Sequence, residues 1–401
     1  MKSGTLPAPA ADARAHSARV VAHIRDEIER TGGCIPFTRY MELALYAPGL
    51  GYYVAGSRKF GDAGDFVTGP ELSPLYGAAL AHQLTLILDA SADRDIVEFG
   101  AGSGALAASV LVALAALDAH ASRYRILEVS PSLRETQRAT IAARVPAMLP
   151  RVEWLDRMPS RIDGAVVMNE VLDAIAPRLV ERREGAWLER GVTWHDGAFA
   201  WQVQPLADSR VEALARDRFP PRGDYASEVN PAAEALVTTV GRRLASGALL
   251  VVDYGFPRAE YYHPQRNGGT LVGHYRHRVH ADPFLWPGLS DLTSHVDFTA
   301  VAQAGERGGL RVAGFATQAS FLLGCGILDL LRDIGAPESI AYLRAAGAVQ
   351  KLLSPAEMGE LFKVLLLARS DVRALALRDQ SHRLSIQRAA DFAPGSTLPS
   401  P

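Results

Sequence analysis

Cysteine is almost absent from this 401-residue chain. Cys34 and Cys325 are the only two, and they lie far apart without forming a CxxC pair. The chain therefore lacks the sequence pattern of a disulfide framework or of a structural zinc site, and we expect a reducing compartment. Lysine is also scarce, so arginine supplies most of the positive charge. With abundant alanine, this composition suggests a bacterial genome of high GC content.

The chain also has no excess of either charge and no long apolar run. Its 42 basic and 44 acidic residues nearly cancel, so no global field would attract nucleic acid or an anionic membrane. No stretch reaches the length of a membrane span, and residues 1–15, although rich in alanine and proline, lack the apolar run of a signal peptide. We therefore expect a soluble, cytoplasmic protein that neither binds nucleic acid nor inserts into a membrane.

What the sequence does contain, from Asp95 onward, is an alternation of short apolar runs and helical patterns. Such alternation predicts an α/β fold with a mostly parallel sheet and helices on both of its faces. The expected strands are 96–99, 125–129, 152–155, 165–168 and 248–253, with a last strand at 362–369. Between the fourth and fifth strands, residues 192–194 and 199–201 flank the turn His195-Asp196-Gly197 and predict an inserted β-hairpin.

Helical patterns precede this core. The first covers residues 18–30, the second covers 37–45, and a third begins after Ser73, an expected N-cap followed by Pro74. The loop over 48–70 is rich in glycine and aromatic residues and contains Asp65. Such loops often shape binding sites. Further helices are expected after Asn230 and within 324–358.

The most informative motif is the glycine loop Glu98-Phe99-Gly100-Ala101-Gly102-Ser103-Gly104, where the first strand ends and a helix begins. Glycines at such a place let a ligand approach the backbone without meeting a Cβ atom. A dinucleotide fingerprint has its third glycine three positions after the second, whereas Gly104 lies only two after Gly102. The spacing disfavours NAD and leaves a nicotinamide oxidoreductase as the weakest alternative.

Acidic residues around the loop narrow the choice of ligand. Glu98 would repel a pyrophosphate, but it suits the cationic amino end of S-adenosylmethionine. Glu128, at the end of the second strand, can accept both ribose hydroxyls. Asp156, after the third strand, either faces the adenine amino group or is a solvated loop acid. The pattern predicts an S-adenosylmethionine site formed by Glu98, Gly100, Ala101, Gly102, Gly104, Glu128, Val129, Asp156 and Asn169.

With these motifs the sequence resembles the MidA-like family of S-adenosylmethionine-dependent methyltransferases. The matches span nearly the whole chain and include 64–73 (GDFVTGPELS), the glycine loop, 127–130 (LEVS), 169–174 (NEVLDA), 252–255 (VDYG), 273–276 (GHYR), 291–298 (DLTSHVDF) and 358–360 (MGE). The chain departs from the family within NEVLDA, because Val171 replaces a common aromatic residue and Ala174-Ile175 replaces Leu-Pro.

The resemblance implies a Rossmann-like class I methyltransferase core with a helical lid drawn from the N-terminal segment and the insertions. We accordingly divide the chain into a disordered tail (1–15), a helical lid segment (16–90), the first core half (91–178), an inserted β-hairpin region (179–228), the second core half with helical additions (229–370) and a C-terminal tail (371–401). For its mitochondrial member the family implies symmetric dimethylation of an arginine on a respiratory complex I subunit. The expected partner is a protein substrate with an arginine-containing segment, and a homodimer is left open.

The residues after the fourth strand bear on the methyl acceptor. Methyl transfer is an in-line displacement that depends on positioning and electrostatics and needs no metal. An arginine acceptor requires a carboxylate that localises the guanidinium charge and aims one nitrogen at the methyl group. Glu170 is our first choice, with Asn169, Asp173 and Asp65 as further catalytic candidates. Alternatively, Asn169 caps the next helix while Glu170 favours its dipole, and Asp65 is a turn residue.

Other polar residues are weaker candidates. Tyr254 follows the fifth strand, where a tyrosine commonly belongs to the core. Glu228 precedes a helix, where an acidic residue is commonly solvated. His274, His277 and His280 repeat every three residues but have no carboxylate or cysteine partner, which argues against a metal site. We expect these histidines to form a polar, aromatic surface for a peptide or partner.

A cofactor motif does not identify the acceptor. The leading hypothesis is a protein arginine methyltransferase. The second is a methyltransferase for a small molecule or lipid, and the third is a non-catalytic respiratory-complex assembly factor with a vestigial cofactor site. Retention of Glu98, the three glycines and Glu128 in one chain argues against the third hypothesis.

Overall fold

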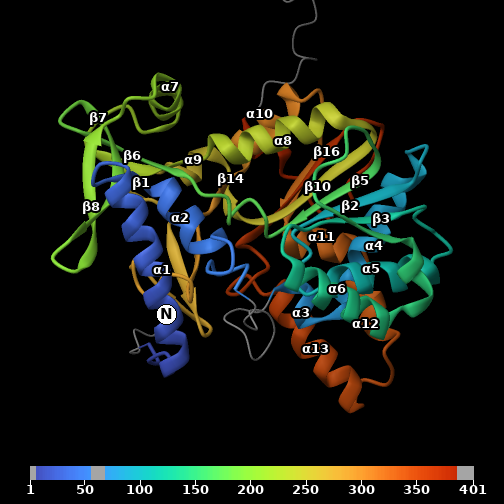
Figure 1. The fold of residues 1–401 in the computed structure, drawn as a ribbon. Coiled ribbons are helices and arrows are strands. Elements are labelled where there is room, and N and C mark those ends of the chain that lie inside the picture. Colours follow the sequence, from blue (N-terminus) through green and yellow to red (C-terminus); the bar gives the residue numbers. More distant parts are fainter. Residues whose placement is uncertain (1–5, 56–67, 386–401) are drawn as a thin grey trace, which may run out of the picture.

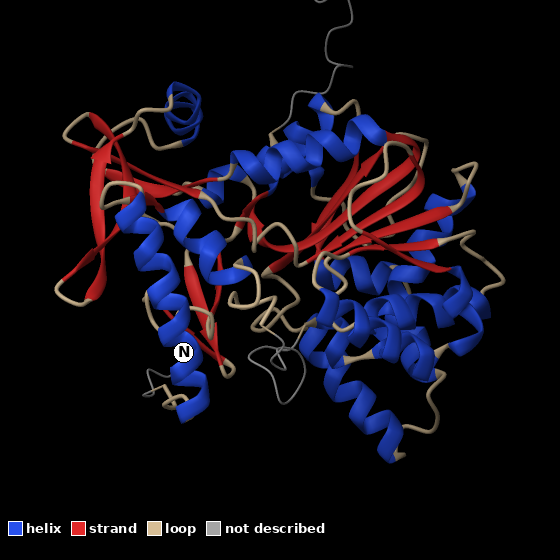
Figure 2. Ribbon diagram, viewed as in Figure 1, coloured by secondary structure: helices blue, strands red, loops and turns tan. Residues whose placement is uncertain are grey.

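The computed structural model describes residues 6–55 and 68–385. It shows two lobes, a larger one built on an eight-stranded sheet and a smaller one that contains a five-stranded antiparallel sheet (Figure 1, Figure 2). A third sheet among the described residues has three strands, β11 (Val272–Tyr275), β12 (Arg278–His280) and β13 (Asp291–Thr293).

The sheet of the larger lobe has the strand order β15-β16-β10-β5-β2-β3-β4. These strands are β2 (Asp95–Phe99), β3 (Tyr124–Leu127), β4 (Val152–Leu155), β5 (Ile162–Asn169), β10 (Leu244–Phe256), β15 (Arg311–Thr317) and β16 (Phe362–Ala368), with the short β14 (Val296–Asp297) beside β10. Neighbouring strands from β4 to β10 pair in parallel, whereas β16 is antiparallel to both β10 and β15. The predicted mostly parallel sheet is confirmed, and β15 is a strand that we did not expect.

Helices cover both faces of this sheet (Figure 1). One face packs against α4 (Pro74–Asp89), α5 (Ala105–Ala116), α6 (Pro131–Arg144), α11 (Gln318–Gly324), α12 (Ile327–Arg332) and α13 (Ile340–Leu353), with the 3-10 turn η1 (Pro146–Arg151) after α6; the other face packs against α8 (Pro231–Arg243) and α10 (Phe298–Arg307). Successive side chains of a strand point to opposite faces. Ile96 and Val97 of β2 accordingly belong to two separate hydrophobic clusters.

The order of the strands fixes where a ligand can bind. From β2 the chain moves outward to β3 and β4, and it then returns to place β5 on the other side of β2. A crevice forms at such a reversal, outside the carboxyl ends of the strands, and is the usual ligand site of open α/β sheets. Phe99 and Asn169 end β2 and β5 at this edge.

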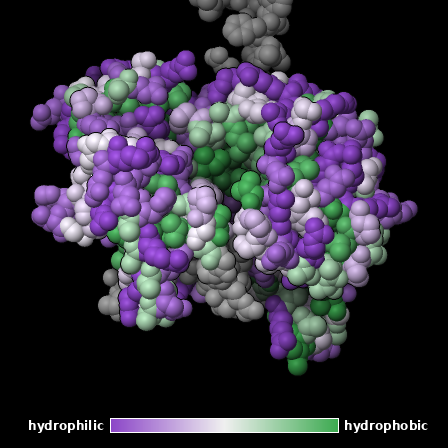
Figure 3. All heavy atoms as spheres, viewed as in Figure 1, coloured by the Kyte–Doolittle hydropathy of each residue, from purple (hydrophilic) through white to green (hydrophobic). Residues whose placement is uncertain are grey.

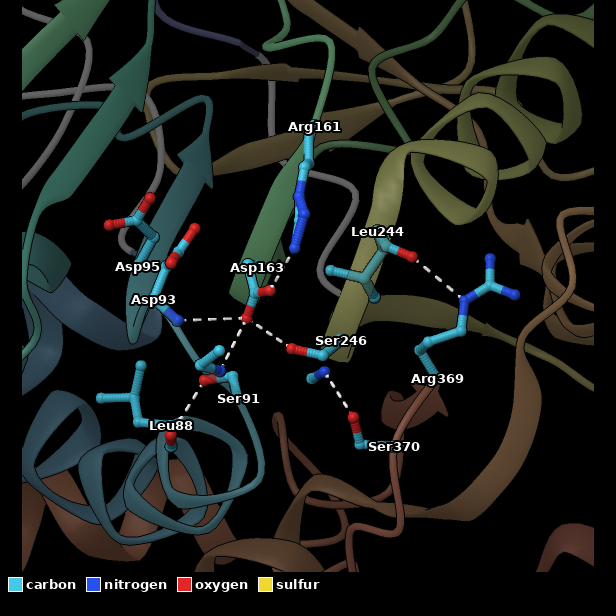
Figure 4. A network of polar contacts seen from close by, with 12 residues as sticks. Leu88, Ser91, Asp93, Asp95, Arg161, Asp163, Leu244, Ser246, Arg369 and Ser370 are labelled. Carbon is cyan, nitrogen blue, oxygen red and sulfur yellow. Dashed lines mark hydrogen bonds and ion pairs between the residues drawn. The ribbon is translucent and has the colours of Figure 1, made fainter.

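At the amino ends of the strands, the buried carboxylate of Asp163 at the start of β5 holds neighbouring segments together (Figure 4). It accepts the backbone N–H groups of Ala92 and Asp93 at 2.8 and 3.2 Å, the hydroxyl of Ser246, and the guanidinium of Arg161 at 2.8 Å. Burial raises the pKa of Asp163, but these hydrogen bonds outweigh it and leave the pKa below its ordinary value. Asp163 therefore joins the start of β5 to the segment before β2 and to β10.

The smaller lobe is more elaborate than the expected hairpin. The predicted hairpin is present as β7 (Ala186–His195) and β8 (Ala198–Pro205), with Asp196 and Gly197 in the left-handed conformation of its turn. Its sheet also contains β1 (Ile35–Pro36), β6 (Arg178–Arg183) and β9 (Tyr225–Val229), and the helices α1 (Ala11–Arg30), α2 (Phe37–Tyr46) and α7 (Ser209–Arg218) belong to the same lobe. We did not predict β6, because its charged residues resemble those of an exposed segment. In the structure Arg178 pairs with Glu189 of the neighbouring strand.

Both predicted tails were too long. Helix α1 begins at Ala11, and Ser17 in its second turn donates a hydrogen bond of 2.9 Å to the carbonyl of Pro287. Residues 371–385 pack on the larger lobe, where Val372 and Leu384 are buried and the short 3-10 turn η2 (Ser381–Leu384) ends the described chain. These long-range contacts offset the entropy of ordering both segments.

Candidate active site

A cavity of about 280 Å³ lies at the carboxyl ends of β2, β3 and β5. Its other walls come from α2, the segment after it, and α3 (Gly69–Leu72). The face in Figure 3 is hollowed between the two lobes, and apolar side chains gather there while polar ones predominate around it. The predicted residues Glu98, Gly100, Ala101, Gly102, Glu128, Val129, Asn169 and Glu170 all line the cavity.

The glycine loop needs its glycines for backbone geometry. Gly100, Gly102 and Gly104 have φ angles of +62°, +53° and +85°, a region that other residues rarely adopt. A Cβ atom on Gly104 would lie 2.9 Å from the Cα atom of Gln137 in α6, so this residue also permits a close approach of two segments. The loop leads directly into α5, whose first residues, Ala105 and Leu106, line the cavity.

Glu98 is buried beneath this loop. Its Oε2 atom accepts a hydrogen bond of 2.7 Å from the hydroxyl of Tyr124. Burial raises the pKa of Glu98 to about 7, although the hydrogen bond from Tyr124 opposes the rise. Among the described residues no cationic side chain pairs with Glu98, and a buried carboxylate of this kind at the wall of a cavity is suited to binding a cationic group of a ligand.

Glu128 directly follows β3 and is held by two donors. The backbone N–H of Ser130 donates to Oε1 at 2.9 Å, and the side-chain amide of Gln137 donates to Oε2 at 3.1 Å. The same Gln137 amide also donates to the carbonyl of Gly102 at 3.1 Å, and its oxygen accepts the indole N–H of Trp154 at 2.9 Å. Sequence reasoning missed Gln137 and Trp154, because both lie outside the motifs and meet only in the fold.

Gly104 does not line the cavity, and Val129 and Asp156 are exposed members of the predicted cofactor set. Val129 is 71% exposed although it lines the cavity. Asp156 is not among the described residues that line it. It forms an ion pair of 2.6 Å with Arg134 and faces solvent. Its exposure fits the solvated-acid alternative, and Arg134 also donates to the carbonyl of Glu128. A contact of Asp156 with the adenine amino group stays a prediction.

Asn169 and Glu170 stand at the end of β5. The hydroxyl of Tyr76 in α4 donates to Asn169 Oδ1 at 2.6 Å, and Asn169 Nδ2 donates to Glu170 Oε1 at 3.0 Å. Glu170 has a φ angle of +54°, which is unfavourable for a residue with a side chain. Asn169 caps no helix here, because a turn and not a helix follows β5.

Burial, together with the neighbouring charge of Asp173, raises the pKa of Glu170 to about 8. Asp173 is itself buried, and its pKa is raised to about 6 by that burial. Asp253, on β10, is the third carboxylate of this cluster and is also buried. We did not predict a site role for Asp253, although it belongs to the VDYG match.

The N-terminal segment supplies the wall opposite the sheet. Tyr46 and Tyr53 both line the cavity, and their rings stack with centroids 5.5 Å apart. The Tyr53 hydroxyl donates to the carboxylate of Asp291 at 2.9 Å. Ser103 of the glycine loop donates to Glu71 of α3, which joins this wall to the cofactor motif. The candidate Asp65 lies outside the described residues.

The weaker candidates have structural roles. Glu228 is buried, not solvated, and accepts the backbone N–H groups of Thr270 and Leu271 at 2.8 and 3.0 Å. Burial, together with the nearby His280, lowers the pKa of His274 to about 4. Within residues 6–55 and 68–385, no group of three histidine, cysteine, aspartate or glutamate side chains is arranged to hold a metal ion. Across the same ranges, no helix combines the length and the apolar character needed to cross a membrane.

Comparison with known proteins agrees with this geometry. Residues 78–316 match the model of a family described as "Putative S-adenosyl-L-methionine-dependent methyltransferase". The chain belongs to this family. The predicted methyltransferase class and the predicted cofactor, S-adenosylmethionine, are thereby confirmed, as is the class I fold that the sheet order indicated.

Individual relatives match most of this methyltransferase chain. It is 30% identical to the Drosophila melanogaster homolog of the mitochondrial protein arginine methyltransferase NDUFAF7, over 90% of this chain and 87% of that protein. It is 29% identical to the Mus musculus NDUFAF7, over 87% and 84%. A Burkholderia thailandensis protein solved with bound S-adenosyl-homocysteine is 49% identical, covers 94% of this chain and 100% of its own, and superposes with a TM-score of 0.90.

Proposed function

We propose that this methyltransferase modifies arginine side chains of a protein substrate. The observation that carries the proposal is the charge of the cavity. The described residues that line it include four glutamates and no lysine, arginine or histidine; the glutamates are Glu71, Glu98, Glu128 and Glu170. Such a lining favours cationic groups both at the cofactor end and at the acceptor end.

The cofactor end fits S-adenosylmethionine, which supplies an electrophilic methyl group bound to a positively charged sulfur. We assign Glu98 to the amino end of the ligand, because it is a buried carboxylate that has no basic partner within the part of the chain that the structure describes. Glu128 is assigned to the ribose hydroxyls, since Gln137 and Ser130 hold its two oxygens in place. The left-handed glycines leave room for the ligand between these two carboxylates.

The acceptor end fits a guanidinium group. Glu170 is the carboxylate that would grip it, with Asn169 fixing the Glu170 Oε1 atom and Asp173 adding negative charge behind it. A guanidinium is planar and remains protonated, so it needs a carboxylate partner that a neutral acceptor does not need. A carboxylate with a pKa near 8 can also take up the proton that the methylated nitrogen loses.

We propose that the predicted lid segment, 16–90, covers this site through its described residues before α4, whereas α4 itself packs against the core sheet. The support for this proposal is that Tyr46 and Tyr53 line the cavity and that α3 contacts the glycine loop through Glu71 and Ser103. The stacked tyrosine rings offer a flat wall on which the aliphatic stem or the plane of an arginine side chain can pack. Asp65 stays a proposed residue that closes over the cofactor or helps to hold the acceptor.

The names of the relatives support a protein arginine substrate. The family resemblance makes a complex I subunit the substrate class to test first. The test is incubation of the purified chain with methyl-labelled S-adenosylmethionine and matched peptide libraries that contain arginine or lysine at one position. We expect label in the arginine library and methylarginine after acid hydrolysis. Label confined to a lipid or small-molecule fraction of a cell extract would instead support the second hypothesis.

The assembly-factor hypothesis is tested separately. Substitution of Glu98 and Gly100 should abolish cofactor binding, because the first removes the buried charge and the second fills the left-handed position. If the substituted protein still restored respiratory-complex assembly in a deletion strain, the cofactor site would be dispensable. Loss of assembly together with loss of methylation would support the enzyme.

A further inference from the structure

Asp253 is fully buried at the carboxyl end of β10, beside the turn that carries Glu170. Its Oδ2 atom accepts hydrogen bonds from three successive backbone N–H groups, those of Val171, Leu172 and Asp173, at 3.2, 2.9 and 3.4 Å. One carboxylate of a neighbouring strand therefore accepts the N–H groups of all three residues that directly follow Glu170. Asp253 itself is not among the described residues that line the cavity.

The turn needs this support because Glu170 is in an unfavourable conformation. Its φ angle is +54°, and a residue with a side chain keeps this backbone conformation only where its surroundings hold it firmly. The backbone N–H of Glu170 donates to the carbonyl of Val252 at 2.8 Å. Two consecutive residues of β10, Val252 and Asp253, thus hold the backbone of Glu170 and the three residues after it.

We infer that Asp253 is a positioning residue of methyl transfer, which fixes the 171–173 turn and thereby the location of the Glu170 carboxylate. The inference rests on the proposed function only in taking Glu170 as the acceptor-binding group. A carboxylate oxygen suits this task, because it can accept several N–H groups at once and leaves no buried donor unpaired. A displacement of about 1 Å at a reacting group can lower a rate about 100-fold.

Two substitutions test the hydrogen-bonding role. Asp253→Ala removes the acceptor, and we expect kcat to fall about 100-fold while the dissociation constant of S-adenosylhomocysteine changes less than about 3-fold. Asp253→Asn keeps one oxygen for the turn amides, and we expect it to retain more than about a tenth of the wild-type kcat. Rescue by asparagine distinguishes positioning through hydrogen bonds from a need for the negative charge.

Asp163→Ala is the matched control. Asp163 is also a buried aspartate of the core sheet that accepts successive backbone N–H groups, those of Ala92 and Asp93, but at the opposite edge (Figure 4). Its removal should lower the melting temperature without selectively lowering kcat. If folded Asp163→Ala and Asp253→Ala lost kcat equally, the effect would be general destabilisation and the inference would be wrong.

Activity is measured with whichever acceptor the wild-type protein methylates in a cell extract, so a non-arginine acceptor would refute the proposed function without affecting this test. Hydrogen exchange of the 171–173 amides provides a readout without substrate. We expect Asp253→Ala to speed their exchange at least 10-fold relative to amides of β2. Unchanged exchange, a kcat within about 3-fold of wild type in Asp253→Ala, or an inactive but folded Asp253→Asn would each overturn the inference.

Discussion

The side-chain amide of Gln137 bridges the two halves of the cofactor motif, since it donates to Glu128 Oε2 and to the carbonyl of Gly102, each at 3.1 Å. Gln137 is fully buried, and its oxygen is held by the indole of Trp154. The amide therefore sets the distance between the glycine loop and the carboxylate assigned to the ribose.

Gln137→Ala should weaken cofactor binding about 10-fold or more, because Glu128 loses a fixed orientation and the Gly102 carbonyl loses its donor. A buried group left unpaired costs about 1–3 kcal/mol. Calorimetric titration with S-adenosylhomocysteine measures the change. Gln83→Ala is the control, because Gln83 is an equally buried glutamine that bonds the backbone of Arg373 and Leu375 far from the cavity. It should lose stability but not affinity.

Glu98→Gln should separate stability from binding. The folded-state pKa of Glu98 is raised to about 7 from 4.5, so ionisation destabilises the folded protein as the pH rises through that window. Glutamine removes this cost, which is about 3 kcal/mol as an upper bound. We expect a higher melting temperature at pH 8 for the ligand-free variant, with cofactor affinity reduced at least 10-fold.

The same ionisation predicts the pH dependence of wild-type binding. Below pH 7 Glu98 must lose a proton before it can bind a cationic group, so affinity for S-adenosylmethionine should fall as the pH falls below about 7 and level off above it. Titrations in buffers of different ionisation heat should detect the released proton. An affinity that does not change between pH 5.5 and pH 8 would contradict the assignment of Glu98.

Glu170→Gln should lower kcat about 100-fold or more, because the acceptor loses its charged partner and the site loses a proton acceptor. In the wild type, kcat/KM should rise with pH through about 8, where the free-enzyme carboxylate ionises, and the variant should lack this rise. Glu184→Gln is the matched control: Glu184 has a φ angle of +50° but is exposed in the turn between β6 and β7. Equal losses in both variants would refute the role of Glu170.

Gly104→Ala tests whether the loop needs space as well as conformation. Gly104 and Gly185 have φ angles of +85° and +82°, but a Cβ atom would meet Gln137 only at Gly104 and nothing within 4 Å at Gly185. Both substitutions should cost about 1 kcal/mol of stability from the left-handed backbone. Only Gly104→Ala should also weaken cofactor binding, by more than about 10-fold. Melting curves and calorimetry distinguish the two effects.

The sequence by itself determined the parts of this protein that depend on local pattern. Alternation of apolar runs gave the parallel strands, and the glycine loop with Glu98 and Glu128 indicated the cofactor, because strand–loop–helix geometry is set by a few adjacent residues. The sequence also predicted the hairpin turn at Asp196 and Gly197. It predicted element boundaries less well, since the first helix was expected from residue 18 and α1 begins at Ala11.

Only the tertiary structure decided which polar groups meet. Gln137 lies 35 residues from Gly102 along the chain, and Asp253 lies 81 residues from Leu172, yet each pair shares a hydrogen bond. No local pattern encodes such pairs, because they depend on how helices and strands pack. For the same reason β6 was hidden by its paired charges, and Asp156 faces solvent instead of the cavity, bound to Arg134.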